Sequence, residues 1–166
     1  MKYHSVKKGY DLMKIRWKPL ILSILIPLAV GGLSALITSG SMDLYSRIQQ
    51  PPLAPPGILF PIVWTILYTL MGISCYRVYC SGAANRSGAL TIYGIQLVLN
   101  FLWSLVFFNG QAYWAAFVII LALWVSIILM IRQFYKADRP AAYWQIPYLV
   151  WVTFAAYLNL AIAILN

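Results

Sequence analysis

Long runs of apolar residues dominate the sequence, and each run is followed by a short polar turn. The five runs cover residues of about 20–38, 59–79, 90–108, 113–131 and 142–164. About 20 apolar residues is the length that a helix needs to cross the hydrocarbon core of a bilayer. The chain of 166 residues is 63% hydrophobic and only 9% charged, unlike an ordinary soluble protein. The sequence therefore predicts an all-α integral membrane protein, with one five-transmembrane-helix bundle over residues 20–166.

The first run admits two interpretations, because a basic tail of residues 1–19 precedes it. A secretory signal peptide has an apolar core of about 7–15 residues and ends at a site of small residues. The first run is longer than that, and no clear A-x-A site ends it. We therefore prefer an uncleaved first helix. Its residues Gly31, Ala35 and Ser39 recur every four positions, a spacing of small residues that permits close contact between helices.

The basic residues gather on one side of the predicted spans. The N-terminal tail holds six, the segment around residue 80 holds two and the loop in the 130s holds three, which makes eleven of the twelve. Basic residues next to membrane spans favour the cytoplasmic face. We therefore expect a cytoplasmic N-terminus in a bacterial cell membrane, with the loop before the second span on the opposite side. Because this topology accounts for the net charge of +9, no nucleic-acid partner is expected.

A proline-rich loop separates the first two predicted helices. Pro51, Pro52, Pro55 and Pro56 each lack a backbone donor, and each favours extended geometry in the preceding residue. Such a segment is stiff rather than flexible. Pro61 then opens the second run, as suits the first turn of a helix. Two interpretations stay open here: an ordinary loop, or a rigid cap over the end of a buried helix.

Three of the runs carry polar or aromatic side chains at intervals of four residues, which places each set on one helix face. The sets are Trp64, Tyr68 and Gly72 in the second run, Gln96, Asn100 and Ser104 in the third (with Trp103 beside them), and Trp151, Ala155 and Asn159 in the fifth. Amide groups facing lipid would cost free energy, so these faces should point into the bundle. Two roles remain open: hydrogen bonds between helices, worth about 0.6 kcal/mol on average, or the lining of a ligand pocket.

Several kinds of reactive centre are excluded by what the apolar runs lack. The one histidine, His4, lies in the tail, and all three aspartates lie outside the runs. The spans therefore offer no imidazole base or metal ligand and no carboxylate for a proton relay. Cys75 and Cys80 are interpreted as two unrelated reduced thiols. We expect no metal, and no cofactor requirement.

A set of motifs recurs in order from about Ile26 to the end of the chain. They are Tyr45, the run Pro51-Pro52…Pro55-Pro56-Gly57, Phe60-Pro61-x-x-Trp64-Thr65-x-x-Tyr68-x-x-Met71-Gly72, Gln96-x-x-x-Asn100-x-x-Trp103-Ser104, and Pro147-Tyr148-x-x-Trp151-x-x-Phe154-Ala155-x-x-Leu158-Asn159. In these motifs the chain resembles the translocator protein family (TspO/MBR, tryptophan-rich sensory proteins, peripheral-type benzodiazepine receptors). The resemblance implies five helices around one pocket, closed by the first loop, that binds porphyrins and in some members sterols or benzodiazepine-type ligands. It also implies a homodimer.

Carried over by motif, the resemblance implies a pocket built from the first loop and from the second, third and fifth helices. Its residues are Tyr45, Pro55, Trp64, Asn100, Trp103, Ser104, Trp151 and Ala155, to which the spaced sets add Tyr68, Gln96 and Asn159. Protoporphyrin IX, or another hydrophobic small molecule, is the expected ligand, to be transported, sequestered or sensed within the membrane lipid. Two alternatives stay open: light-dependent porphyrin breakdown, with Trp64 and Trp151 as the reacting residues, and a stress sensor that acts through a partner protein.

A short pattern in the last part of the chain matches one proposed for sterol contact in reversed order. Its residues are Arg139, Tyr143 and Leu149. Patterns of this kind are weak evidence of sterol binding.

The charge distribution predicts which residues a membrane-impermeant thiol reagent will reach. In a chain whose Cys75 and Cys80 are replaced, a cysteine at Ser46 should be labelled from outside the cell. A cysteine at Ser5 should be protected, because the basic tail favours the cytoplasmic side. Preferential labelling at Ser5 over Ser46 in intact cells would contradict this topology.

Overall fold

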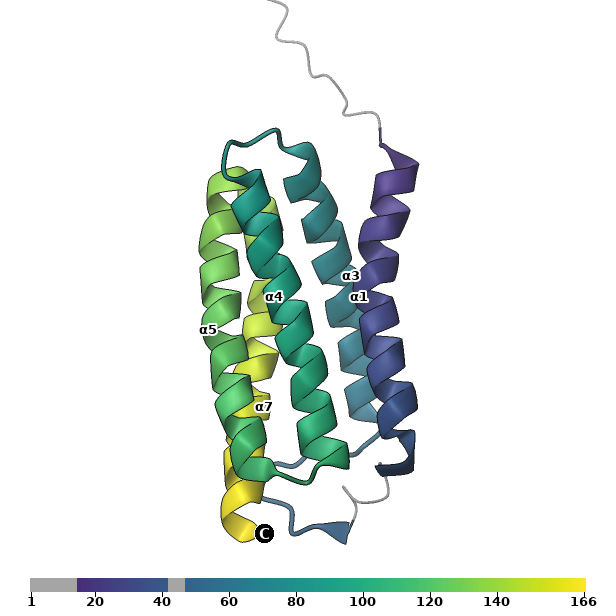
Figure 1. The fold of residues 1–166 in the computed structure, drawn as a ribbon, viewed down its shortest axis with the longest axis vertical. Coiled ribbons are helices and arrows are strands. Elements are labelled where there is room, and N and C mark those ends of the chain that lie inside the picture. Colours follow the sequence, from purple (N-terminus) through teal and green to yellow (C-terminus); the bar gives the residue numbers. More distant parts are fainter. Residues whose placement is uncertain (1–14, 42–46) are drawn as a thin grey trace, which may run out of the picture.

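The computed structural model describes residues 15–41 and 47–166, which form a bundle of helices that run alternately up and down (Figure 1). The helices are α1 (Trp17–Thr38), α3 (Leu59–Cys80), α4 (Arg86–Ser104), α5 (Tyr113–Ala137), α6 (Arg139–Tyr143) and α7 (Ile146–Leu165), with a 3-10 turn η1 (Ser39–Ser41) after α1 and a π-helical turn η2 (Leu105–Asn109) after α4. Within the described residues, five segments are long and apolar enough to cross a membrane, with α6 and α7 together forming the fifth. The predicted all-α class and the count of five spans are confirmed.

Several helices extend beyond the predicted spans. The first helix begins at Trp17 rather than near residue 20, α4 begins at Arg86 rather than near residue 90, and α5 continues to Ala137. The backbone hydrogen bonds of a helix do not depend on apolar side chains, so a helix can continue past the hydrocarbon core into the headgroup layer. Apolar runs therefore locate the membrane-buried part of each helix and miss its ends.

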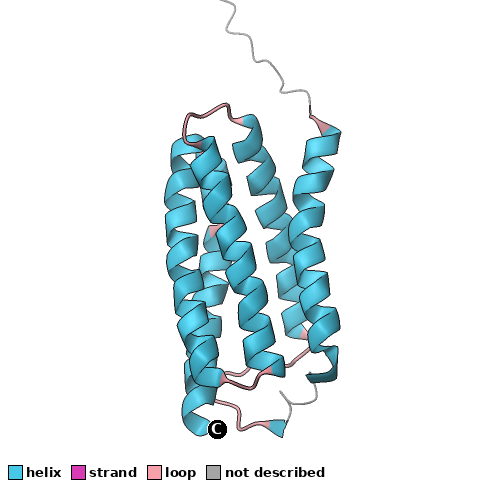
Figure 2. Ribbon diagram, in the orientation of Figure 1, coloured by secondary structure: helices cyan, strands magenta, loops and turns pink. Residues whose placement is uncertain are grey.

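The fifth span is interrupted at Trp144 and Gln145, just before Pro147. Figure 2 shows the other loops at the two ends of the bundle. A proline ring clashes with the carbonyl group four residues earlier and offers no donor, so a continuous helix through Pro147 is disfavoured. The chain closes α6 after one turn and starts α7 anew, which places Pro147 in the first turn of a helix.

Helix α1 packs mainly against α3 through two glycines. A Cβ atom added at Gly72 of α3 would lie 2.5 Å from the Cα atom of Ile24 and 2.7 Å from the carbonyl oxygen of Ser23, both on α1. A Cβ atom at Gly31 of α1 would overlap the ring of Tyr68 on α3. Small residues let helix backbones approach closely in a membrane, where dispersion contacts drive helix association. At Gly31, the first of the three spaced small residues of the first run, the close contact is thus within the chain.

The opposite side of the bundle is built by α4 against α5 and by α5 against α7. At the basic end, where α3 ends and α5 meets α6, Arg77 of α3 donates to both carboxylate oxygens of Asp138, at 3.0 and 2.9 Å. Asp138 also accepts from the backbone N–H of Ala141 at 2.8 Å and so caps α6. One half-buried carboxylate therefore fixes α3, α5 and α6 relative to one another.

The close approach of α1 to α3 predicts the effect of a single methyl group. Gly72→Ala should lower the free energy of unfolding by about 1–3 kcal/mol, because the added atom meets backbone that cannot rotate away. Gly94→Ala on α4 is the matched control: nothing lies within 4 Å of the added atom, and alanine favours the helix by about 0.5–1 kcal/mol. Thermal unfolding of both variants in detergent measures the difference; equal stability of the two would show that α1 does not pack at Gly72.

Candidate ligand-binding site

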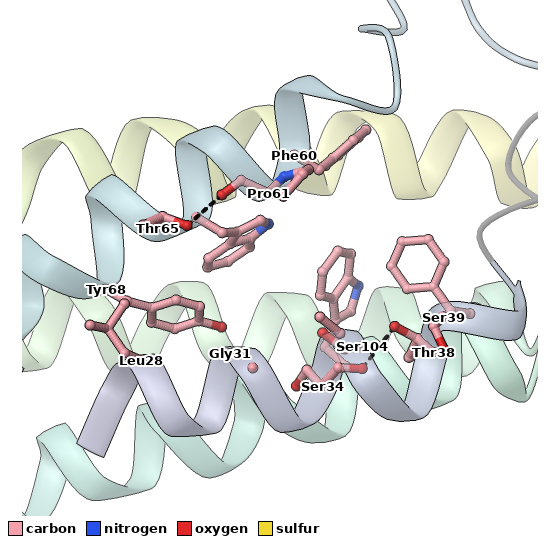
Figure 3. Close-up of a pocket in the computed structure, with 15 residues that line it drawn as sticks. Leu28, Gly31, Ser34, Thr38, Ser39, Phe60, Pro61, Thr65, Tyr68 and Ser104 are labelled. Carbon is pink, nitrogen blue, oxygen red and sulfur yellow. Dashed lines mark hydrogen bonds between the residues drawn. The ribbon is translucent and has the colours of Figure 1, made fainter. Parts of the chain in front are cut away.

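A cavity of about 370 Å³ lies between α1, α3 and the last turns of α4, in the half of the bundle next to the loop that joins α1 to α3. Its lining comprises Leu28, Gly31, Gly32, Ser34, Ala35, Thr38 and Ser39 from α1 and η1, Phe60, Pro61, Trp64, Thr65 and Tyr68 from α3, and Trp103, Ser104 and Phe108 from α4 and η2. Figure 3 shows α1 and α3 on opposite sides of the space, with Tyr68 toward one end and Ser39 toward the other. Aromatic rings thus face a wall of small residues.

The hydroxyl groups of this lining are largely engaged within the protein. Thr65 donates to the carbonyl oxygen of Pro61 at 2.7 Å, and Thr38 donates to that of Ser34 at 2.8 Å. The hydroxyl of Tyr68 donates to Asn100 Oδ1 at 2.8 Å. None of the residues that line the cavity is charged. The interior therefore suits an uncharged, mainly apolar molecule, and any ionised group of a ligand has to stay at the mouth, near water.

A chain of hydrogen bonds closes the cavity at its deep end. Asn100 accepts from Tyr68 and donates through Nδ2 to the hydroxyl of Tyr148 at 3.0 Å. That hydroxyl donates to Gln96 Oε1 at 2.7 Å, and Gln96 Nε2 points at the sulfur of Met71, 3.9 Å away. Gln96 and Asn100 are completely buried and do not line the cavity. For these two amides the structure shows the helix-to-helix role that the sequence left open.

A second pair of contacts ties the cavity wall to α5 and α7. Trp103 donates through Nε1 to Asn159 Oδ1 at 2.9 Å, and Asn159 donates to the carbonyl oxygen of Tyr113 at 2.8 Å. A small cavity of about 20 Å³ lies beside this contact, lined by Phe60, Trp103, Phe107, Phe108, Ala155, Leu158, Asn159 and Ile162. Three of these residues also line the large cavity, so they separate the two spaces.

Comparison with known proteins agrees with this architecture. Residues 23–165 match the TspO/MBR family. The chain belongs to the TspO/MBR family. It is 40% identical over 148 residues to tryptophan-rich protein TspO of Archaeoglobus fulgidus, covering 89% of this chain and 96% of the relative. It is 31% identical over 147 residues to the translocator protein of Bos taurus (86% and 87% covered), and 30% identical over 138 residues to protein CrtK of Rhodobacter capsulatus (82% and 85% covered). The resemblance inferred from the motifs is confirmed.

The TspO/MBR motif residues do not all meet in one place. The large cavity brings together Trp64, Tyr68, Trp103 and Ser104, and the small one is lined by Trp103, Ala155 and Asn159. Trp151 lines neither space; its ring lies edge-on to Phe60, with the centroids 6.0 Å apart. Pro55 is half-buried in the loop and also lines neither, and Tyr45 falls outside the described residues.

Two parts of the site were missed by the reading of the sequence. The wall from α1 consists mainly of small residues and carries no aromatic ring or amide; only the spacing of Gly31, Ala35 and Ser39 pointed to that face. Tyr148, the centre of the hydrogen-bond chain, was recognised only as part of a family motif. It lies seven residues before Ala155 and eleven before Asn159, a helical spacing that places the three on one face.

The proline-rich loop is fastened to α7 in this TspO/MBR bundle. The side-chain amide of Asn166 donates to the carbonyl oxygen of Gln49 at 3.1 Å and accepts from its N–H at 3.0 Å. The hydroxyl of Tyr157 donates to the carbonyl oxygen of Pro52 at 3.0 Å. None of residues 47–58 lines the large cavity. The described loop therefore covers the end of the bundle without forming a wall of the cavity.

Removing single hydroxyl groups tests the hydrogen-bond chain. Tyr148→Phe leaves Asn100 Nδ2 without its acceptor and Gln96 Oε1 without its donor, so it should lower the free energy of unfolding by about 1–2 kcal/mol. Tyr93→Phe is the matched control: Tyr93 is similarly buried, but its hydroxyl has no hydrogen-bond partner among the described residues, so its removal should be neutral or stabilising. Unfolding of both variants in detergent checks the pair; a Tyr148→Phe protein as stable as the control would exclude a role for the chain.

Proposed function

We propose that the protein binds a hydrophobic tetrapyrrole such as protoporphyrin IX in the cavity between α1, α3 and α4. The observation that supports this best is the shape of the lining. Trp64 and Tyr68, whose rings stack at 5.3 Å, present aromatic surface from α3, while Gly31 and Gly32 of α1 add no side chain to the opposite wall. Flat π-systems pack well against aromatic rings, and the volume lies within the range of small-molecule sites, roughly 300–1,000 Å³.

The charge pattern supports the same class of ligand. The lining holds no cation that could pair with a carboxylate inside the cavity. The macrocycle would occupy the apolar interior, and its two propionates would project past Ser39 and Phe60 toward water, where ionised groups lose little hydration. Binding in this form requires neither a metal nor another cofactor. Transport, sequestration and sensing all begin with such a complex.

The placement of the protein in its membrane forms part of this proposal. Lys and Arg gather at the end of the bundle where α1 begins and α5 ends, so we place that end, with the N-terminus, on the cytoplasmic side. The cavity then lies in the opposite half of the membrane. The exposed apolar face of α1, with Leu22, Leu25 and Leu36, would contact lipid or a second copy in a homodimer.

One tryptophan of the cavity provides the test of binding. In the dark, protoporphyrin IX should quench the tryptophan fluorescence of the purified protein. Trp64→Phe should weaken binding by about 0.5–1.5 kcal/mol, since one aromatic contact is reduced. Trp114→Phe, at the start of α5 and 59% exposed, should leave the affinity unchanged. No quenching of the wild type, or equal losses in both variants, would refute a site in this cavity.

The same titration under illumination addresses the enzymatic alternative. Of the two tryptophans named for it, Trp64 lines the cavity and Trp151 does not. If the protein only binds the porphyrin, the absorption spectrum of the bound ligand should change in light at the same rate in the wild type and in the Trp64→Phe variant. The two rates are compared at equal occupancy of the site. Faster loss with the wild type would establish photochemistry at Trp64.

A further inference from the structure

A group of basic and aromatic side chains lies on the surface at the junction of α5 and α6. We define this basic patch by Arg132, Tyr135 and Lys136 on α5 and Arg139 and Tyr143 on α6, all of which are exposed. The first three fall within one helical turn and a half, so they share a face of α5. The patch lies at the basic end of the bundle, where α5 ends and α6 begins. A basic end next to membrane spans is expected at the level of the lipid headgroups.

No carboxylate neutralises this patch within the part of the chain that the structure describes. Asp138 is the one acidic residue there, and it lies between Lys136 and Arg139 in sequence. Both of its oxygens are engaged by Arg77, and Oδ1 also caps α6. Three positive charges are therefore available to a negatively charged partner.

The arginine at the centre of the patch is held in position. The guanidinium of Arg139 lies over the ring of Tyr135, 5.2 Å from its centroid, and Tyr135 meets Tyr143 edge-on at 6.1 Å. Stacking on an aromatic face restricts an otherwise flexible side chain, and it leaves the N–H groups at the edge of the guanidinium plane free to bind an anion. Two planar, preoriented N–H groups match the oxygens of a phosphate better than a mobile ammonium does.

The surface next to the patch is apolar and faces away from the bundle. Leu121, Val125 and Leu129 are 43%, 50% and 44% exposed and follow one another at intervals of four along the face of α5 that leads to the patch. A molecule with a phosphate at the basic patch could lay acyl chains along this stripe. A soluble anion would make no use of it.

From these observations we propose that the basic patch binds the phosphate of an anionic phospholipid, with its acyl chains on the stripe of α5. Arg139 contacts the phosphate, and Arg132 and Lys136 extend toward it from the membrane side, their stems against apolar surface. Two residues of the sterol-contact pattern, Arg139 and Tyr143, belong to this patch, whereas Leu149 lies beyond the interruption between α6 and α7. This assignment does not depend on the ligand of the cavity.

The experiment is a lipid titration of the purified full-length protein in detergent, followed by native mass spectrometry. The two probes are phosphatidylglycerol and phosphatidylcholine with identical acyl chains. The wild type should retain phosphatidylglycerol in preference. Arg139→Gln should weaken that binding roughly fivefold, the loss expected for one basic residue near a lipid surface. Arg139→Lys should lie between the two, because it keeps the charge and loses the planar donors.

Arg86→Gln is the matched control. Arg86 lies at the same end of the bundle and also stacks on a tyrosine, 5.4 Å from the centroid of Tyr79, but it is the first residue of α4, away from the junction of α5 and α6. It donates in addition to the carbonyl oxygen of Tyr79 at 3.2 Å. Its loss should leave phosphatidylglycerol binding unchanged. Equal weakening by Arg86→Gln and Arg139→Gln would mean that only the overall charge matters and would overturn the site.

Two further outcomes would also overturn it. Equal retention of phosphatidylcholine would show that the acyl chains alone bind, and displacement of the lipid by inorganic phosphate would indicate a site for a soluble anion. The unfolding temperature of each variant is measured in the same detergent. If Arg139→Gln unfolds early, Lys136→Gln takes its place with the same expected loss, because Lys136 is exposed and makes no ion pair among the residues that the structure describes.

Discussion

A chain of hydrogen bonds centred on one buried tyrosine hydroxyl holds three helices of this bundle in register. Tyr148 of α7 accepts a hydrogen bond from Asn100 and donates one to Gln96, and Asn100 in turn accepts from Tyr68 of α3. In a bilayer the lipid is as apolar as the helix surfaces, so burial alone does not select how helices meet. Buried amides do favour one arrangement of the helices, because each amide costs free energy unless it finds a hydrogen-bond partner. The position of α3 relative to α4 and α7 follows from satisfying these groups.

This chain of polar groups also divides the bundle into a filled half and an open half. On the side of the basic end, Met71, Val78, Met130 and Phe134 have no exposed surface and fill the space between the helices. On the other side, α1 comes close to α3 at Gly72 and Gly31 and then presents small residues to the aromatic rings of α3 and α4. The cavity exists because the glycines that permit the helix contact continue into a wall of mainly small side chains.

Much of this could be predicted from the sequence, and the failures have physical causes. Apolar length and charge placement determine the number of spans, and helical periodicity correctly placed Trp64, Tyr68 and Asn100 toward the interior. Helical periodicity assigns a residue to a face of its helix but does not show which groups that face meets. Asn100 and Ser104 therefore fell in one set, although Asn100 belongs to the hydrogen-bond chain and Ser104 lines the cavity. Tyr148 was missed because the set that starts at Trp151 and recurs every four residues does not include it, although it lies on the same helix.

The walls of the cavity differ in what it costs to move them. Tyr68 and Trp103 are each held by a hydrogen bond to a buried amide, so displacing either ring would leave an unpaired polar group in an apolar interior. Helix α1 is fastened near its ends, where Tyr76 bonds to the N–H of Arg16 and Asn109 donates to the carbonyl oxygen of Ile37. Between these points Ser23 forms a side-chain hydrogen bond with Cys75, far from the cavity. Along the cavity α1 meets the rings of α3 by dispersion contacts, each worth only about 0.1–0.2 kcal/mol per atom pair. Widening the cavity therefore costs the least free energy on the side of α1. This is the wall for which the sequence pattern gave the weakest indication.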